Sequence, residues 1–176
     1  MTFATTGLDT AAPLDREPID VPRFKEVLAR LASGVAVVAC WDGGEPAGLL
    51  VSSLTGLSVE PPRFLFCVRK QASAYPALAR AGLASLTLLA ADQQEQARLF
   101  SATAFADQRF RGPDWLFEAD APRLTGGLAS IVGRLEPAFD AGEHTVFIFA
   151  AERMEDRKAE PLIYHDRGFA RPVALV

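Results

Sequence analysis

Ser52 and Ser53 stand together at the end of an apolar run and are the first residues that could contact a ligand. Small hydroxyl residues leave the backbone N–H and C=O groups of a strand accessible and add two hydroxyl groups of their own. Such a strand suits a flat heterocycle with polar edges, or a phosphate. An edge strand of small residues that binds nothing would have the same composition, so the serines alone leave both interpretations open.

A second candidate feature combines positive charge with the expected start of a helix. Arg69 and Lys70 are followed by Ser73, where a helical segment is predicted to begin. Two cations beside the free amide groups of a helix N-terminus would attract a phosphate monoester. Solvated surface charge explains the same residues about as well.

Aromatic and basic side chains also gather between residues 105 and 115. This run contains Phe105, Arg109, Phe110, Arg111 and Trp115. Rings and guanidinium groups in such a loop could clamp a planar ligand. Loop aromatics packed around an ion pair are a commoner arrangement, so this feature is weaker than the serine pair.

The sequence lacks the motifs of several other kinds of site. The sequence contains no glycine-rich dinucleotide loop, no phosphate loop of the Walker type and no Gly-x-Ser-x-Gly nucleophile elbow. Cys40 and Cys67 lie inside apolar runs that favour buried thiols, and two cysteines are too few for a disulfide scaffold or a Cys-rich zinc site. His144 and His165 lack the spacing of metal ligands, so no metal site is predicted.

The elements that must position these residues are mostly strands. Apolar runs predict strands over residues 34–41, 47–55, 63–69, 83–90, 128–139, 144–154 and 161–166, with a tight hairpin at residues 42–44. Most of these strands follow one another without an intervening helix. This order favours an antiparallel barrel over a doubly wound parallel sheet.

Three short helices complete the prediction. Asp20 can cap and Pro22 can open a first helix with apolar residues at helical spacing, ended by Gly34; these apolar residues are Phe24, Val27, Leu28 and Leu31. Ser73 is a possible cap for a helix within residues 72–82. Asp92 and Glu95 have the cap and N3 spacing for a helix over residues 92–100.

The composition sets the outer limits. The chain of 176 residues is 49% apolar and 23% charged, as expected for one domain with an ordinary core. Its net charge of −4 opposes binding to nucleic acid or an anionic membrane. No apolar run approaches the roughly 18 to 20 residues of a spanning helix, and a secretory signal pattern is absent. We therefore expect a cytoplasmic protein with a flexible arm over residues 1–20 and one domain over residues 21–176.

Taken in order, the motifs resemble those of a known family. They are GVAVV, Ser52-Ser53, SVEPP, RKxxS, DQxxxAxxF, DQRF, LxGGLAS and Gly142-Glu143-His144. This series, from about Phe24 to Phe169, resembles the short-chain flavin reductases, which have an FMN-binding split barrel and typically serve as the small component of two-component monooxygenases. The resemblance implies a mainly β fold: a homodimeric, six-stranded antiparallel Greek-key barrel with a few short flanking helices.

The resemblance also implies a site and a reaction. Hydride would pass from NADH or NADPH to FMN or FAD, and the reduced flavin would feed a partner monooxygenase. Residues implied to line the edge of the isoalloxazine ring are Leu49, Leu50, Val51, Ser52 and Ser53. The two serines would reach toward the ribityl chain or phosphate, helped by Arg69, Lys70 and Ser73. Around the cleft would lie Phe100, Arg109 and Phe110, with His144 as the catalytic candidate beside the nicotinamide. Tyr164 is as suited to core packing as to a ligand contact.

The sequence departs from the family pattern at several positions. The departures are Leu50 for Thr, Leu54 for Phe, Gly56 for Ser, Gly133 for Cys, Glu143 for Asp and Phe149 for Gly. Leu50 and Gly56 remove polar groups, and Phe149 adds a large ring where the family leaves room. Two alternatives therefore stay open: a different flavin-dependent enzyme on the same barrel, such as an oxidase or a redox-neutral biosynthetic catalyst, or a non-catalytic dimeric scaffold that has lost flavin.

Overall fold

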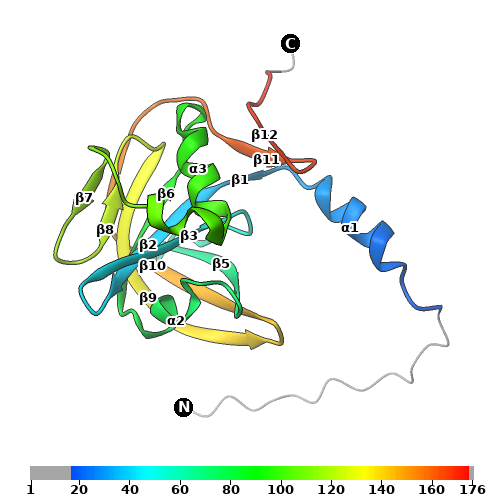
Figure 1. Ribbon diagram of the computed structural model, residues 1–176, viewed down its shortest axis with the longest axis horizontal. Coiled ribbons are helices and arrows are strands. Elements are labelled where there is room, and N and C mark those ends of the chain that lie inside the picture. Colours follow the sequence, from blue (N-terminus) through cyan, green and yellow to red (C-terminus); the bar gives the residue numbers. More distant parts are fainter. Residues whose placement is uncertain (1–16, 175–176) are drawn as a thin grey trace.

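The computed structural model describes residues 17–174, apart from the side chains of residues 137 and 138, and shows one curled antiparallel sheet with short helices around it (Figure 1). The arm predicted over residues 1–20 lies outside the described residues up to residue 16. Among residues 17–174, no helix combines the length and apolarity needed to cross a bilayer. The first helix, α1, covers Val21–Ala29.

The main sheet contains seven strands in the order β3-β2-β6-β9-β10-β5-β4. Their bounds are Ala36–Asp42 (β2), Glu45–Val51 (β3), Thr55–Ser58 (β4), Arg63–Arg69 (β5), Leu83–Leu88 (β6), Ala129–Ala141 (β9) and His144–Asp156 (β10). All pairings between neighbours are antiparallel. The predicted mainly β, antiparallel class is confirmed. The described sheet has one strand more than the six expected, because the short β4 pairs with the first half of β5.

Smaller elements surround this sheet. One small sheet contains three strands, β1 (Ser33–Gly34), β11 (Ile163–His165) and β12 (Gly168–Ala170). Another contains two strands, β7 (Trp115–Phe117) and β8 (Pro122–Leu124). The remaining helices are α2 (Tyr75–Arg80) and α3 (Gln94–Ser101), with 3₁₀ turns over Ala91–Gln93 (η1) and Thr103–Gln108 (η2). Helix α3 lies over β3 and β2 (Figure 1), whereas the buried residues of α2 pack inside the curled sheet.

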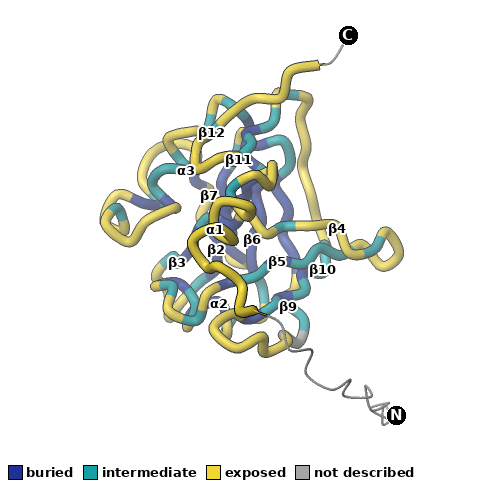
Figure 2. Tube along the Cα trace, turned by 90° about the vertical axis from the view of Figure 1, so that its right-hand side faces the viewer, coloured by how far each residue is buried: buried dark blue, intermediate teal, exposed yellow. Residues whose placement is uncertain are grey.

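Strand β2 is buried on both faces, which explains its uninterrupted apolar sequence. Ala36, Val38 and Cys40 belong to the core cluster inside the curled sheet. The alternate residues Val37 and Ala39 belong to a second cluster, under α3 and the β7–β8 hairpin. The buried segments accordingly run through the centre of the molecule (Figure 2). Burial raises the pKa of the Cys40 thiol to about 11, which confirms the predicted buried thiol at this position. The same prediction is wrong for Cys67, which is only partly buried.

The predicted hairpin turn and the predicted cap of the first helix are confirmed, whereas the predicted end of that helix is wrong. Gly43 and Gly44 form the predicted turn between β2 and β3 with φ of 61° and 98°, a conformation that favours glycine. Asp20 caps α1 by accepting a hydrogen bond from the Arg23 amide at 3.4 Å, as predicted. The helix ends at Ala29, however, and the expected stop, Gly34, lies in β1.

Two predicted helix caps are wrong. Helix α2 begins at Tyr75 after Ala74, and the Ser73 hydroxyl accepts no capping hydrogen bond from its first turn. Helix α3 begins at Gln94, after the turn η1, so Asp92 does not cap it. Instead, both carboxylate oxygens of Asp92 accept from Arg157 at 3.0 Å.

Candidate functional site

A cavity of about 180 Å³ lies where β3, β5 and the C-terminal end of α3 meet. It is lined by Leu49, Leu50, Cys67, Val68, Arg69, Ala72, Ser73, Phe100, Ser101, Thr103 and Arg109. The lining includes six of the site residues implied by the family resemblance: Leu49, Leu50, Arg69, Ser73, Phe100 and Arg109. Strands β3 and β5 supply opposite walls, and α3 with its following turn supplies the third.

Arg109 is held in place by backbone carbonyl groups. Its guanidinium group donates to the carbonyl oxygens of Leu99 at 2.9 Å, Ala102 at 2.8 Å and Gly48 at 3.1 Å. The residue is only 9% exposed, and burial lowers its pKa from the usual arginine value. It takes part in none of the ion pairs between described residues. Arg109 thus brings to the cavity wall a fixed positive charge without a carboxylate partner.

Arg69 gives the cavity a second positive charge. It is the last residue of β5, and its Nη2 lies 3.6 Å from Oε2 of Glu143, in an ion pair exposed to solvent. The lining described above contains no acidic residue, while Ser73, Ser101 and Thr103 add hydroxyl groups. Two cations with several hydroxyl groups suit an anionic, oxygen-rich ligand group such as a phosphate.

The rest of the wall is apolar and rigid. Leu49, Leu50 and Phe100 provide an apolar surface against which a planar ring can lie. The Phe100 ring stacks on Trp115 at 5.5 Å between centroids and meets the edge of Phe110 at 5.0 Å. These contacts fix the orientation of the Phe100 ring toward the cavity.

Phe110 lies in this aromatic cluster, outside the cavity lining. Its backbone has a φ of 59°, and its Cζ lies only 3.1 Å from where a Cβ would stand on Gly48. Gly48 therefore allows the ring to approach β3 closely. Phe110 supports the wall through Phe100.

Other predicted site residues lie beside the cavity without lining it. Val51 is buried inside the curled sheet, Ser52 is exposed, and the Ser53 hydroxyl is bonded to the backbone of Cys67. Lys70 Nζ lies 2.8 Å from both carboxylate oxygens of Asp140, and this contact lowers the pKa of Asp140. The structure therefore gives Ser53 and Lys70 protein partners.

His144 lies at the rim. It is exposed, opens β10 and is paired in register with Arg69 of the neighbouring strand. Opposite residues of an antiparallel pair share a face, so His144 stands next to the cationic end of the cavity. Tyr164 packs edge-on against Phe169, with 5.6 Å between ring centroids, beside the second core cluster. Of the two roles considered for Tyr164, core packing and ligand contact, the structure shows core packing.

Phe149 does not narrow the cavity. It is completely buried inside the curled sheet, and its Cζ lies 2.8 Å from the position that a Cβ on Gly133 would take. The absence of a side chain at Gly133 thus provides the space for the Phe149 ring. The two departures from the family pattern, Gly133 and Phe149, lie against each other within the core, and Phe149 is not among the residues that line the cavity.

Sequence reasoning missed part of the lining. Cys67, Val68, Ala72, Ser101 and Thr103 were not selected. The alternation of β5 gave a usable signal for Cys67, because Cys67 and Arg69 lie two residues apart on one face of a strand. Ser101 is the last residue of α3 and Thr103 begins the next turn, so their position depends on where that helix ends.

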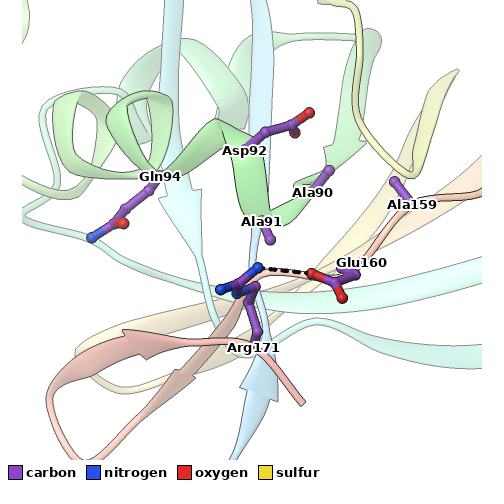
Figure 3. Close-up of a pocket in the computed structure, with 7 residues that line it drawn as sticks. All are labelled: Ala90, Ala91, Asp92, Gln94, Ala159, Glu160 and Arg171. Atoms are coloured by element: carbon purple, nitrogen blue, oxygen red, sulfur yellow. Dashed lines mark hydrogen bonds and ion pairs between the residues drawn. The ribbon is translucent and has the colours of Figure 1, made fainter. Parts of the chain in front are cut away.

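A larger cavity of about 440 Å³ lies at the other end of α3 (Figure 3). Its charged side chains partly neutralise one another, since Arg171 pairs with Glu160 at 3.1 Å and Asp92 adds another carboxylate. No described residues form a cluster suited to hold a metal ion. The smaller, cationic cavity is therefore the better candidate for an anionic ligand.

A family model described as a flavin reductase like domain matches residues 28–172. The chain belongs to the flavin reductase family. Among curated relatives of this flavin reductase-like chain, FMN reductase (NADH) RutF 2 of Methylorubrum extorquens (strain PA1) is 35% identical over 163 residues, which cover 90% of this chain and 95% of that protein. The reductase subunit HsaB of a flavin-dependent monooxygenase from Rhodococcus jostii (strain RHA1) is 35% identical over 151 residues, covering 85% and 76%.

Solved structures agree with this assignment. The NADH:FAD oxidoreductase SgcE6 of Streptomyces globisporus, in complex with NAD and FAD fragments, superposes with a TM-score of 0.80 at 26% identity, covering 90% of this chain and 98% of that one. The flavin reductase fold expected from the ordered motifs is thus confirmed.

Proposed function

We propose that the protein is an NAD(P)H-dependent flavin reductase that transfers hydride from the nicotinamide to FMN or FAD and passes the reduced flavin to a monooxygenase. The observation that carries this proposal is the cationic cavity between β3 and β5, where Arg69 and Arg109 lie beside an apolar wall. A flavin mononucleotide has the matching parts, a phosphate group and a flat ring. The relatives named as an NADH-dependent FMN reductase and as a monooxygenase reductase subunit support the same reaction.

Each part of the cavity has a task in this reaction. Arg109, Arg69 and Ser73 bind the phosphate, and Leu49, Leu50 and Phe100 hold the ring by apolar contact. When bound, the flavin supplies the hydride-accepting ring. The protein needs no acid–base pair for a direct hydride transfer, since positioning the two rings in contact provides most of the catalysis. His144 orients the nicotinamide donor, and its register opposite Arg69 at the rim supports this role.

A homodimer in the cytoplasm is part of the proposal. The large apolar residues of α1 and its flanks are exposed, namely Ile19, Val21, Phe24, Val27, Leu28 and Leu31. An exposed apolar surface of this kind is typical of a protein interface, and a second copy is the partner implied by the family resemblance. The two cysteines are free thiols, the usual state in a reducing compartment.

The test is a titration of the purified protein with FMN and with FAD, followed by anaerobic addition of NADH. We expect bleaching of many flavin equivalents per protein chain. Arg69→Ala should raise the KM for flavin about tenfold, because it removes a charged phosphate contact. Arg134→Ala, which removes an exposed arginine paired with Glu152, should leave the KM unchanged.

Two results would contradict the proposal. Flavin that binds without being reduced by NADH or NADPH would indicate a different flavin-dependent enzyme. Absence of any flavin binding would indicate a scaffold without this activity.

A further inference from the structure

The sheet has an opening beside the cavity. Strand β4 pairs with β5 at Arg63, Phe64 and Leu65, and the second half of β5 has β10 on one side and no paired strand on the other. Strand β3, which faces this opening, pairs with β2 and ends at Val51. The backbone groups of β5 that point into the opening therefore need other partners.

Ser53 supplies that partner with one side chain. Its Oγ accepts a hydrogen bond from the Cys67 amide at 2.9 Å and donates to the Cys67 carbonyl oxygen at 3.1 Å. Both backbone groups of Cys67 are satisfied by one hydroxyl group. The side chain thus replaces the missing strand at this point and ties the segment that follows β3 to β5.

The same bonds limit what Ser53 can offer a ligand. A hydroxyl group has one donor hydrogen, and in Ser53 that hydrogen is directed to Cys67. The phosphate oxygens and ring carbonyls of a flavin are acceptors and require donors. Ser53 has no donor left for them.

We infer that Ser53 is a positioning residue, whose hydroxyl group fixes the separation of the two strands that carry opposite walls of the flavin cavity. Leu49 and Leu50 lie a few residues before Ser53 on one wall, and Cys67 to Arg69 form the other. The inference rests on the proposed function for its ligand. It replaces a direct contact between Ser53 and flavin, which the family resemblance implied, with an indirect role.

Residue-resolved amide exchange by NMR tests the link without any ligand. In the unsubstituted protein, the Cys67 amide should exchange slowly although no strand is paired with it on that side. Ser53→Ala should accelerate this exchange at least about tenfold, while the Lys70 amide, bonded to the Glu143 carbonyl oxygen at 2.9 Å, should not change. A Cys67 amide that exchanges freely in the unsubstituted protein would overturn the inference, and this measurement needs no variant to fold.

Flavin titration then tests the consequence for binding. Ser53→Ala should weaken FMN binding about tenfold, since two neutral hydrogen bonds hold the walls together. Ser53→Thr keeps the hydroxyl group and should restore both the affinity and the slow exchange. Thr55→Ala, which removes an exposed hydroxyl group on β4, is the matched control and should change neither.

The outcomes separate this inference from the proposed function. Unchanged FMN affinity in Ser53→Ala, with normal binding by the unsubstituted protein, would refute the positioning role and leave the reductase assignment intact. Weakened affinity without faster Cys67 exchange would indicate a direct contact with flavin and would also refute it. If the unsubstituted protein binds neither FMN nor FAD, the proposed function fails, and the exchange data still decide whether Ser53 links the strands.

Discussion

Arg109 connects three segments of the chain through a single guanidinium group. Two of its acceptors, the carbonyl oxygens of Leu99 and Ala102, lie at the C-terminal end of α3, and the third belongs to Gly48 in β3. The negative end of a helix favours a nearby cation, which helps to keep this buried arginine charged. Arg109 therefore shapes the cavity as well as charging it. A loss of activity on its substitution would not distinguish ligand binding from wall geometry, which is why Arg69 is the better test of phosphate binding.

Phe149 offers a prediction about stability. Phe149→Ala should lower the free energy of unfolding by about 3–5 kcal/mol, because it empties a fully buried site against Gly133. Flavin affinity should stay within about twofold, since Phe149 does not line the cavity. Urea unfolding followed by circular dichroism, together with FMN titration, measures both quantities. Val146→Ala, a half-buried residue on the opposite face of β10, should cost less. A large gain in flavin affinity at unchanged stability would instead place Phe149 at the ligand cleft.

At the scale of the elements, strands were predicted better than helix ends. The run 63–69 matches β5 at both bounds, because an apolar sequence ended by charged residues is enough to define a buried strand. The start of α3 was missed because Asp92 is engaged by Arg157, 65 residues away in the sequence. A capping signal depends only on residues nearby in the sequence, so it cannot predict an ion pair with such a distant partner.

The candidate site could be predicted only in part for a similar reason. Arg69, Ser73 and Arg109 stood out by residue type, and the family resemblance grouped them. The bonds of Ser53 to Cys67 depend on an opening in the sheet, which follows from how far β4 extends along β5. Residue types and spacing do not contain that information.

The β7–β8 hairpin offers a prediction about pH. Glu118 follows β7 and accepts hydrogen bonds from the buried Arg123 at 2.8 Å and from Arg153 at 2.6 Å. The hydrogen bond from Arg123 is the main reason that the pKa of Glu118 lies below its ordinary value of 4.5. The unfolded chain then takes up a proton at higher pH than the folded protein. The stability contributed by Glu118 is present above pH 4.5 and is lost as the pH falls through the lower, folded pKa.

Glu118→Gln tests this directly. The variant should be about 1–2 kcal/mol less stable at pH 7, because it removes a charge-assisted hydrogen bond to Arg123. Between pH 6 and about pH 3, the unsubstituted protein should lose more stability than the variant, as measured by urea unfolding at each pH. Glu152→Gln, which breaks an exposed pair with Arg134, is the control and should cost at most about 1 kcal/mol. Parallel pH profiles for Glu118→Gln and the unsubstituted protein would show that Glu118 does not anchor the hairpin.

At the scale of the whole molecule, α1 is an element whose apolar face is not covered by the rest of the described chain. It projects from the curled sheet (Figure 1), and none of its residues is buried. Its cap is in place, and Phe24, Val27 and Leu28 have the spacing of an apolar helix face. A short helix of this kind is stabilised mainly by packing. Such packing is absent within the described part of the chain, and we propose that a second copy of the chain covers this face.

The substitution Leu28→Glu tests the proposed dimer. In an isolated chain, Leu28 is 47% exposed, and a charged replacement there should have little effect on stability. In a dimer closed by α1, the same change places a carboxylate in an apolar interface and should raise the dimer dissociation constant at least about 30-fold. Sedimentation equilibrium should show twice 18.9 kDa for the unsubstituted protein and a shift toward 18.9 kDa for the variant. Leu116→Glu, on the distant β7, is the matched control and should remain dimeric (Figure 1). An unsubstituted protein of 18.9 kDa at micromolar concentration would refute the dimer, and a dimer that tolerates Leu28→Glu would place its interface on another face.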